Sequence, residues 1–298
     1  MYKKNKLKKI IVILGPTSSG KTDLSIKLAK KFNGEVISAD SRQVYKGMDI
    51  GTGKITKKEM EGIPHYLLDV VSPNSKFSVA QYQKLALKNI NQICKRNKIP
   101  FLVGGSPFYI YSVLEAWTFP KLNPDWDLRK KLEKKSCEDL SNILKKIDSE
   151  RFKNIDKNNK RRLIRAIEIA KKLGKVPSLK KEVQFNPLKI GIKKSKQEIK
   201  ELIEKRLQKR LKQGMIEEIK NLKEKGVSWK RLENFGLEYK WIALYLQKKI
   251  DHSEMVYSLQ KDIEHFAKRQ MTWFKRDKNI KWITSYEEAK NLLEDFLE

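Results

Sequence analysis

The sequence has 298 residues, of which 39% are hydrophobic and 34% charged, and 66 Lys and Arg against 36 Asp and Glu give a formal net charge of +30. This length, with apolar residues spread along the whole chain, excludes a disordered protein and predicts one large or two modest folded domains. The absence of any run near the ~20 apolar residues of a membrane span predicts a cytoplasmic protein with no membrane association. The net positive charge favours a polyanion such as nucleic acid as the partner. The alternative is that many of the Lys residues only cover solvated helix faces.

Strands alternate with helices through the first third of the chain. A continuous apolar run at 9–14 is typical of a strand buried on both faces, and the spacing of Leu24, Leu28 and Phe32 predicts a helix over 20–32. Further strands are expected at 35–40, 65–70 and 99–105, with a helix at 79–95 before the last of them. This alternation predicts an α/β fold with a parallel sheet flanked by helices.

The region from Pro120 to Pro187 has a different character, with short helical patterns, many basic residues and no apolar strand run. It predicts a helical insertion domain at 120–186 within a core formed by 1–119 and 187–298. The chain is expected to return to the sheet with a strand at 188–194. Helices at 196–225, 236–248 and 252–275, a short strand at 280–283 and a last helix are expected to follow.

Residues 15–22, GPTSSGKT, match the phosphate-binding loop pattern G-x-x-x-x-G-K-[ST] between a predicted strand and a predicted helix. Its backbone N–H groups can surround phosphate oxygens, Lys21 adds a full positive charge, and the Thr22 hydroxyl can bind Mg²⁺. The loop leaves open whether the ligand is a nucleoside triphosphate or a diphosphate ester. The expected phosphate-binding residues are Gly15, Pro16, Thr17, Ser18, Ser19, Gly20, Lys21 and Thr22.

Polar residues follow two further strands at the edge where parallel sheets place ligands. The Asp40 carboxylate can hold Mg²⁺ or an acceptor hydroxyl, accept a proton from a nucleophile, or cap a turn. Ser41, Arg42 and Gln43 add polar groups suited to reading a base edge. The Ser106 hydroxyl can stabilise negative charge on a leaving group, cap the next helix, or do both.

Six motifs in this order resemble the family of tRNA dimethylallyltransferases: GPTSSGKT, ISADSRQVYKGMDIGTGK, HYLLDV, FLVGGSPFYI, RRLIRAIEI and FAKRQMTWFKR. The resemblance implies a P-loop α/β core with a helical insertion. It also implies transfer of a dimethylallyl group from dimethylallyl diphosphate to the exocyclic amine of the adenosine 3′ of the anticodon, with Mg²⁺ as cofactor. The implied partner is the tRNA anticodon stem-loop, and a monomer is expected.

The same resemblance assigns roles to single residues. The loop 15–22 is implied to hold the donor diphosphate, with Mg²⁺ on Thr22. Asp40 is implied to bind the adenosine amine and accept its proton, Ser106 to lie beside the oxygen that leaves, and Arg206 to reach the diphosphate. Ser106 stands where the family usually has Thr, and keeps the hydroxyl. The residues implied to contact tRNA are Asp40, Ser41, Arg42, Gln43, Ser106, Arg129, Arg161, Arg162, Leu163, Ile164 and Arg165.

Besides Ser106, three places depart from the family pattern. Arg161 replaces a Gln, Arg210 occupies a position that is commonly Met, and the segment 236–240 lacks the usual Gly-Tyr-Arg or Gly-Tyr-Lys form. The competing interpretations are a P-loop small-molecule kinase, a prenyltransferase acting on free adenine nucleotide, and an RNA-binding module without enzymatic activity.

Overall fold

The computed structural model describes residues 7–120, 122–178 and 183–298. The chain divides into two compact units: unit 1 comprises Met1–Ala116 and Val183–Glu298, and unit 2 comprises Trp117–Glu182. The bounds of unit 2 lie within a few residues of 120–186, where the change in composition placed the insertion.

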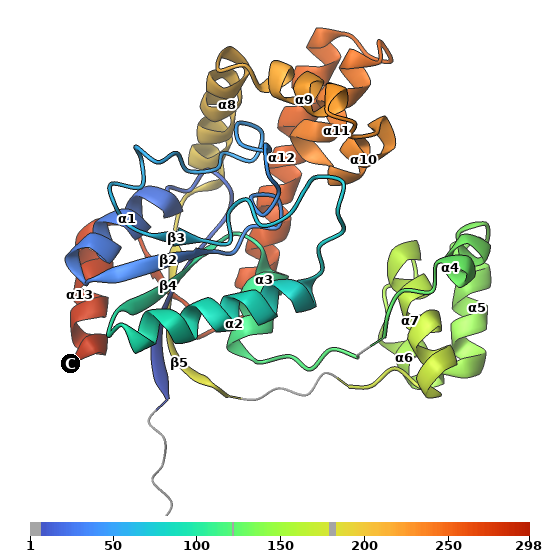
Figure 1. Cartoon of the computed structure of the whole chain (residues 1–298), viewed down its shortest axis with the longest axis horizontal. Helices are drawn as coiled ribbons and strands as arrows, with labels where there is room; N and C mark the ends of the chain where they lie inside the picture. The colour runs from blue at the N-terminus through green and yellow to red at the C-terminus, as the bar shows by residue number, and fades with distance from the viewer. Residues whose placement is uncertain (1–6, 121, 179–182) are drawn as a thin grey trace, which may run out of the picture. The chain divides into compact units, whose positions relative to one another are not determined.

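Unit 1 contains a six-stranded sheet in the order β3-β2-β4-β1-β5-β6, in which every neighbouring pair is parallel (Figure 1). β1 lies between β4 and β5, with Ile13 opposite both Val103 and Ile190. The predicted parallel α/β sheet is confirmed. The strands are β1 (Lys8–Leu14), β2 (Gly34–Ser38), β3 (His65–Tyr66), β4 (Ile99–Gly104), β5 (Phe185–Ile192) and β6 (Lys281–Ile283).

The strand expected at 65–70 is only two residues long. Leu67 and Asp69 adopt left-handed backbone conformations, with φ of 65° and 53°, and an extended strand cannot continue through them. The apolar run HYLLDV therefore predicted the strand correctly at its start and wrongly after Tyr66.

Helices cover the sheet and bury its apolar side chains. Ile11 and Ile13 of β1 pack with Leu28 of α1 (Lys21–Lys31) and Leu293 of α13 (Tyr286–Leu297). α2 (Val79–Lys95) packs on β2 and β4 and begins with a capping box at Ser78, and α3 (Pro107–Leu114) packs on α2. The buried sheet thus holds the carboxyl ends of β1, β2 and β4 at one edge.

The rest of unit 1 is a group of helices that follows β5 (Figure 1). The single helix expected at 196–225 is two helices, because Gly214 has a left-handed φ of 93° that interrupts the regular hydrogen-bonding pattern. α10 was not expected, and the helix expected at 236–248 is α11. The bounds are α8 (Lys196–Lys212), α9 (Met215–Glu224), α10 (Trp229–Phe235), α11 (Leu237–Leu246) and α12 (His252–Phe274).

Every element of the described part of unit 2 is a helix: α4 (Trp126–Glu133), α5 (Cys137–Ile147), α6 (Ser149–Lys153) and α7 (Lys160–Leu173). Leu140 and Leu144 of α5 pack against Leu163 and Ile167 of α7 in a small core of their own. Across the described residues of both units, no helix combines the length and the apolarity that crossing a bilayer requires.

Candidate functional site

The phosphate-binding loop connects β1 to α1. Gly20 immediately precedes the helix with a left-handed φ of 88°, a conformation that residues with a Cβ rarely adopt. The Ser19 hydroxyl is buried without a hydrogen-bond partner among the described residues. Buried polar groups are nearly always satisfied, so an unpaired hydroxyl inside this loop fits a site completed by a polar ligand.

Lys21 lies under the loop, where its Nζ donates to the Pro16 carbonyl at 2.6 Å. Burial and the nearby Arg206 cation lower the pKa of Lys21 to about 7, and Asp40 opposes this shift. So low a pKa means that too little negative charge surrounds the buried ammonium group to stabilise it. A bound phosphate group would supply that charge.

The loop is fixed from the C-terminal part of the chain by Gln270 of α12. Its Oε1 accepts the N–H of Thr17 at 2.9 Å, and its Nε2 donates to the carbonyl of Gly105 at 2.7 Å. The side chain is buried and ties the loop to the end of β4. The sequence interpretation did not single out Gln270, which stood within a motif read only for its basic and aromatic residues.

Arg206 reaches the same loop from α8. Its Nη1 lies 3.4 Å from the Thr17 hydroxyl, and the side chain is half-buried. Burial and the neighbouring Arg210 lower the pKa of Arg206 to about 10, which leaves the guanidinium charged at neutral pH. The structure therefore places Arg206 at the phosphate loop, where the family resemblance expected it.

Asp40 follows β2 and lies close enough to Lys21 and Arg206 to affect the pKa of both. Its Oδ1 accepts the backbone N–H groups of Arg42, at 2.8 Å, and Gln43, at 3.4 Å. The turn-capping alternative is thus observed. Because the turn holds the carboxylate in place beside the phosphate loop, capping and a chemical role are compatible.

Ser106 precedes α3, yet its hydroxyl does not cap that helix. Its Oγ instead accepts the backbone N–H of Ser41 at 3.1 Å, and its own N–H donates to the Ala39 carbonyl at 3.2 Å. These bonds join the ends of β2 and β4. Since Oγ acts as an acceptor toward Ser41, its own proton is oriented away from that bond and can serve a ligand.

Arg42 and Gln43 are engaged with the protein. The Gln43 side chain accepts from the Ser38 hydroxyl at 3.0 Å and donates to the Gly53 carbonyl at 3.2 Å. The Arg42 guanidinium lies 5.4 Å from the centre of the Phe235 ring. Reading a base edge with Gln43 would require these bonds to be exchanged.

Within unit 2, two of the four arginines implied to bind tRNA, Arg129 and Arg165, bond to one buried carboxylate. Arg129 donates through Nε and Nη2 to Glu168, at 2.9 and 2.7 Å, and Arg165 also bonds to Glu168. Burial alone would raise the pKa of Glu168, but hydrogen bonds from Arg129 and Arg165 lower it to about 2. Arg161 and Arg162 are exposed, and Arg162 lies 3.7 Å from Asp156.

The expected tRNA contact of the stretch 161–165 stays a prediction, but two of its side chains lie inside unit 2. Leu163 and Ile164 are 0% and 6% exposed and belong to the core of unit 2. They lie on the inner face of α7, where the helical period places them against α5, and so they cannot present apolar groups to RNA.

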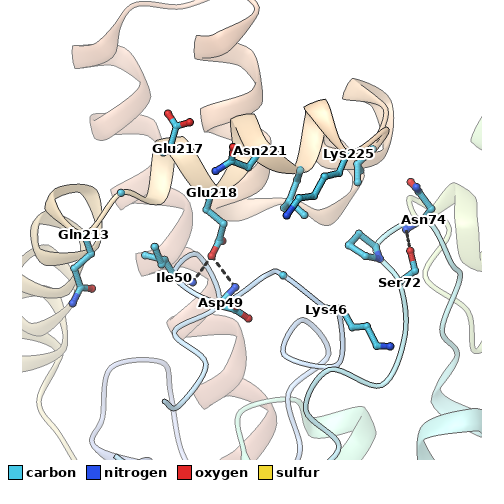
Figure 2. Close-up of a pocket in the computed structure, with 15 residues that line it drawn as sticks. Lys46, Asp49, Ile50, Ser72, Asn74, Gln213, Glu217, Glu218, Asn221 and Lys225 are labelled. Atoms are coloured by element: carbon cyan, nitrogen blue, oxygen red, sulfur yellow. Dashed lines mark hydrogen bonds between the residues drawn. The ribbon is translucent and has the colours of Figure 1, made fainter. Parts of the chain in front are cut away.

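A separate cavity of about 710 Å³ lies between α9 and two loops, as Figure 2 shows. In it the Glu218 carboxylate accepts the N–H groups of Asp49 and Ile50, at 2.8 and 2.5 Å. The cavity contains none of the expected site residues. Its lining is Lys46, Gly47, Asp49, Ile50, Ser72, Pro73, Asn74, Gln213, Gly214, Glu217, Glu218, Asn221, Leu222, Lys225 and Val227.

No cluster of three or more His, Cys, Asp or Glu residues in the described ranges could hold a metal ion. Thr22 is exposed at the start of α1, beside the phosphate loop. Mg²⁺ is commonly bound by one or two protein oxygens together with phosphate oxygens and water. Thr22 and the phosphate loop therefore fit an ion that binds together with a phosphate ligand. The described residues here do not form a complete metal site of their own.

Together, the sheet order, the loop at the end of its central strand, and the cations and carboxylate around that loop define an α/β protein of the P-loop type. Residues 43–277 match the family model described as IPP transferase. The tRNA dimethylallyltransferase of Halothermothrix orenii is 42% identical over 306 residues, covering 97% of this chain and 93% of that protein.

Solved structures agree with this match. The tRNA isopentenylpyrophosphate transferase of Bacillus halodurans has a TM-score of 0.74 at 36% identity, over 98% of this chain and 96% of that one. A eukaryotic dimethylallyltransferase, solved acting on tRNA, has a TM-score of 0.80 at 27% identity, over 97% of this chain and 77% of that one. This chain belongs to the tRNA dimethylallyltransferase family.

Proposed function

We infer that this protein transfers a dimethylallyl group from dimethylallyl diphosphate to the exocyclic N6 amine of the adenosine 3′ of the anticodon in tRNA, and releases diphosphate. The observation that carries this inference is the arrangement of Asp40, Ser106 and Arg206 around the phosphate loop. Family membership supports the same activity.

The site is suited to binding the leaving group. In the proposed reaction a bond forms between N6 and the allylic carbon, while the bond from that carbon to the diphosphate oxygen breaks and the oxygen takes the electron pair. The N–H groups of the loop, Lys21 and Arg206 offer positive charge where this negative charge develops, and the Ser106 hydroxyl can donate to the departing oxygen.

Mg²⁺, when bound with the donor at Thr22, would neutralise part of the diphosphate charge. The residues of the chain hold the donor from the other sides. Gln270 keeps the N–H of Thr17 and the carbonyl of Gly105 in fixed positions, so the loop is organised before the donor arrives.

Asp40 is suited to the acceptor side. N6 of adenine is a weak nucleophile and carries a proton that must leave once the new bond forms. The Asp40 carboxylate, fixed by the N–H groups of Arg42 and Gln43, can accept a hydrogen bond from N6 and then the proton. Its position beside Lys21 and Arg206 keeps it close to the donor.

We extend the proposal to the anticodon stem-loop as the partner of the basic residues of unit 2. A base stacked in an anticodon loop must be extracted before its amine can react, which requires grip on the surrounding backbone. The exposed Arg161 and Arg162 and the net charge of +30 support binding to a polyanion. We also propose a cytoplasmic location, where tRNA and a water-soluble diphosphate ester meet, and a monomeric state.

The test is incubation of the purified protein with dimethylallyl diphosphate, Mg²⁺ and an unmodified tRNA, followed by mass spectrometry of the anticodon-loop nucleosides. The expected product is one adenosine heavier by a C₅H₈ unit. Equal rates with AMP and tRNA would replace this function by transfer to free nucleotide, and phosphoryl transfer from labelled ATP to a small acceptor would replace it by a kinase. No transfer to any of these would leave an RNA-binding module.

A further inference from the structure

Arg210 is a buried cation that the proposed reaction does not yet use. It lies on α8 one helical turn after Arg206, so both side chains extend from the same face of the helix. It is 8% exposed, and its Nη1 donates to the Gly51 carbonyl and to Glu238 Oε1, each at 3.2 Å. Its Nη2 is buried and has no hydrogen-bond partner among the described residues.

The unpaired Nη2 lies beside Arg206. A Cβ built on Gly53 would lie 1.7 Å from Arg210 Nη2 and 2.1 Å from Arg206 Nη2, so the two guanidinium groups are neighbours over the backbone of Gly53. Any side chain at position 53 would displace both of them, and Gly53 also has a left-handed φ of 59°. Gly53 thus leaves room for two converging cations.

Two adjacent cations with one buried donor left over require a compensating anion. Glu238 satisfies Nη1 of Arg210, and Asp40 acts on both arginines only at longer range. Lys21 adds a third cation around the same loop. A buried guanidinium left without part of its hydrogen bonding is costly unless a ligand completes it.

We propose that Arg210 is a second diphosphate-binding arginine, whose Nη2 joins Arg206 Nη2 in binding an oxygen of the donor diphosphate. The inference rests on the proposed function and deepens it. Arg206 links the pair to the phosphate loop through Thr17, while Glu238 and the Gly51 carbonyl hold Arg210 in place. A diphosphate carries enough negative charge to bridge both guanidinium groups with charge-assisted hydrogen bonds.

If Arg210 had only a structural role, its removal would change stability and leave the affinity for diphosphate unchanged. The test therefore separates a structural role from ligand binding. Arg210→Met keeps an unbranched apolar stem and removes the guanidinium with its charge, but leaves Glu238 buried and unpaired, which by itself can destabilise the protein. The double variant Arg210→Met/Glu238→Gln removes both charges of the pair. If the double variant regains stability, a loss of affinity for diphosphate reports the contribution of Arg210 to ligand binding.

The measurement is isothermal titration of the full chain with inorganic diphosphate and, separately, with an anticodon stem-loop RNA. We expect the double variant to bind diphosphate about 10- to 100-fold more weakly than wild type, as for loss of a hydrogen bond to a charged group, and to bind the RNA as wild type does. Glu238→Gln alone should bind diphosphate at least as tightly as wild type. Lys209→Met, an exposed neighbour on α8, controls for the loss of one positive charge.

A stable double variant that binds diphosphate as tightly as wild type would overturn the proposal. Weaker RNA binding with unchanged diphosphate binding would also overturn it, since the unpaired donor would then serve a tRNA phosphate. If the wild-type protein transfers the dimethylallyl group while Arg210 proves dispensable, only this inference fails. If the wild-type protein neither binds diphosphate nor transfers the group, the proposed function fails with it.

Discussion

Gln270 and Thr17 are 253 residues apart in the chain and are joined by a 2.9 Å hydrogen bond from the Thr17 N–H to Gln270 Oε1. The same amide donates to Gly105, so one side chain of α12 connects the phosphate loop to the end of β4. The loop is therefore held in position by a distant helix as well as by its own glycines.

Replacing Gln270 by Ala should weaken donor binding more than tRNA binding. The change leaves the N–H of Thr17 and the carbonyl of Gly105 without their partner, at a cost of about 1–3 kcal/mol for each group that stays buried. Steady-state kinetics should show a higher KM for dimethylallyl diphosphate and an unchanged KM for tRNA. Gln260→Ala, on the same helix and bonded to Glu264 one turn further along, should behave as wild type. Equal effects on both KM values would contradict a specific role in shaping the loop.

Replacing Asp40 by Asn should lower kcat with little loss of stability. An amide oxygen can still accept the N–H groups of Arg42 and Gln43, so the turn is retained, but an amide cannot take the proton from N6. Loss of a general base typically lowers the rate by about 10²- to 10⁴-fold. Single-turnover assays and thermal unfolding of the same preparation provide the comparison. A fully active Asp40→Asn protein would show that the carboxylate is only a turn cap.

Lys21 should make diphosphate binding depend on pH. Burial and Arg206 lower its pKa to about 7 in the protein without ligand, so the side chain loses its charge as the pH rises through 7. Affinity for inorganic diphosphate should then fall above about pH 7, and this component should be missing in Lys21→Met. Arg206→Met removes the neighbouring cation, so it should raise the pKa of Lys21 and move the decline to higher pH. Parallel pH profiles for wild type and Lys21→Met would refute this assignment.

The same pKa affects folding in a defined direction. Between pH 7 and the usual lysine value of 10.5, the unfolded chain keeps the proton that the folded chain has lost at Lys21. The unfolded state therefore binds more protons in this range, and the contribution of Lys21 makes the protein more stable as pH rises. Denaturant unfolding should show a difference in free energy between wild type and Lys21→Met that shifts in favour of wild type from about pH 7 to 10. An unchanged difference would mean that Lys21 keeps its normal pKa.

The sequence predicted those parts of the protein that depend on neighbouring residues. The phosphate loop was recognised because its function requires fixed spacing between Gly15, Gly20 and Lys21, and β1 because buried parallel strands are apolar throughout. The break at Gly214 was missed because isolated glycines are tolerated in helical patterns. The end of β3 was missed because nothing in HYLLDV signals the left-handed backbone at Leu67.

The sequence pattern could not predict contacts between segments that are far apart in the chain. Gln270 matters because α12 crosses the phosphate loop, and Arg210 because Glu238 and Gly53 meet it in space. Position 210 stood out in the sequence only as a departure from the family pattern. The roles of these residues follow from the tertiary structure, which periodicity and composition do not encode residue by residue.

Replacing Glu168 by Gln should disorganise the arginines of unit 2 and leave unit 1 intact. Glu168 is fully buried, and Arg129 and Arg165 both bond to its carboxylate. Removing one partner of a buried ion pair can cost up to about 3–5 kcal/mol. Hydrogen exchange should therefore speed up in α4 and α7 of the variant, and KM for tRNA should rise while KM for dimethylallyl diphosphate stays the same. Glu133→Gln, an exposed change on α4, is the matched control.

The pH dependence of the same unit provides an independent check. Hydrogen bonds from Arg129 and Arg165 overcome the effect of burial and lower the pKa of Glu168 to about 2, from an ordinary 4.5. The folded chain therefore binds fewer protons here than the unfolded chain between these values. The stabilisation is complete above about pH 4.5 and is lost as the pH falls towards 2, and Glu168→Gln should lack this acid-sensitive component. If exchange in α4 and α7 responds to acid equally in wild type and variant, Glu168 does not hold the two arginines.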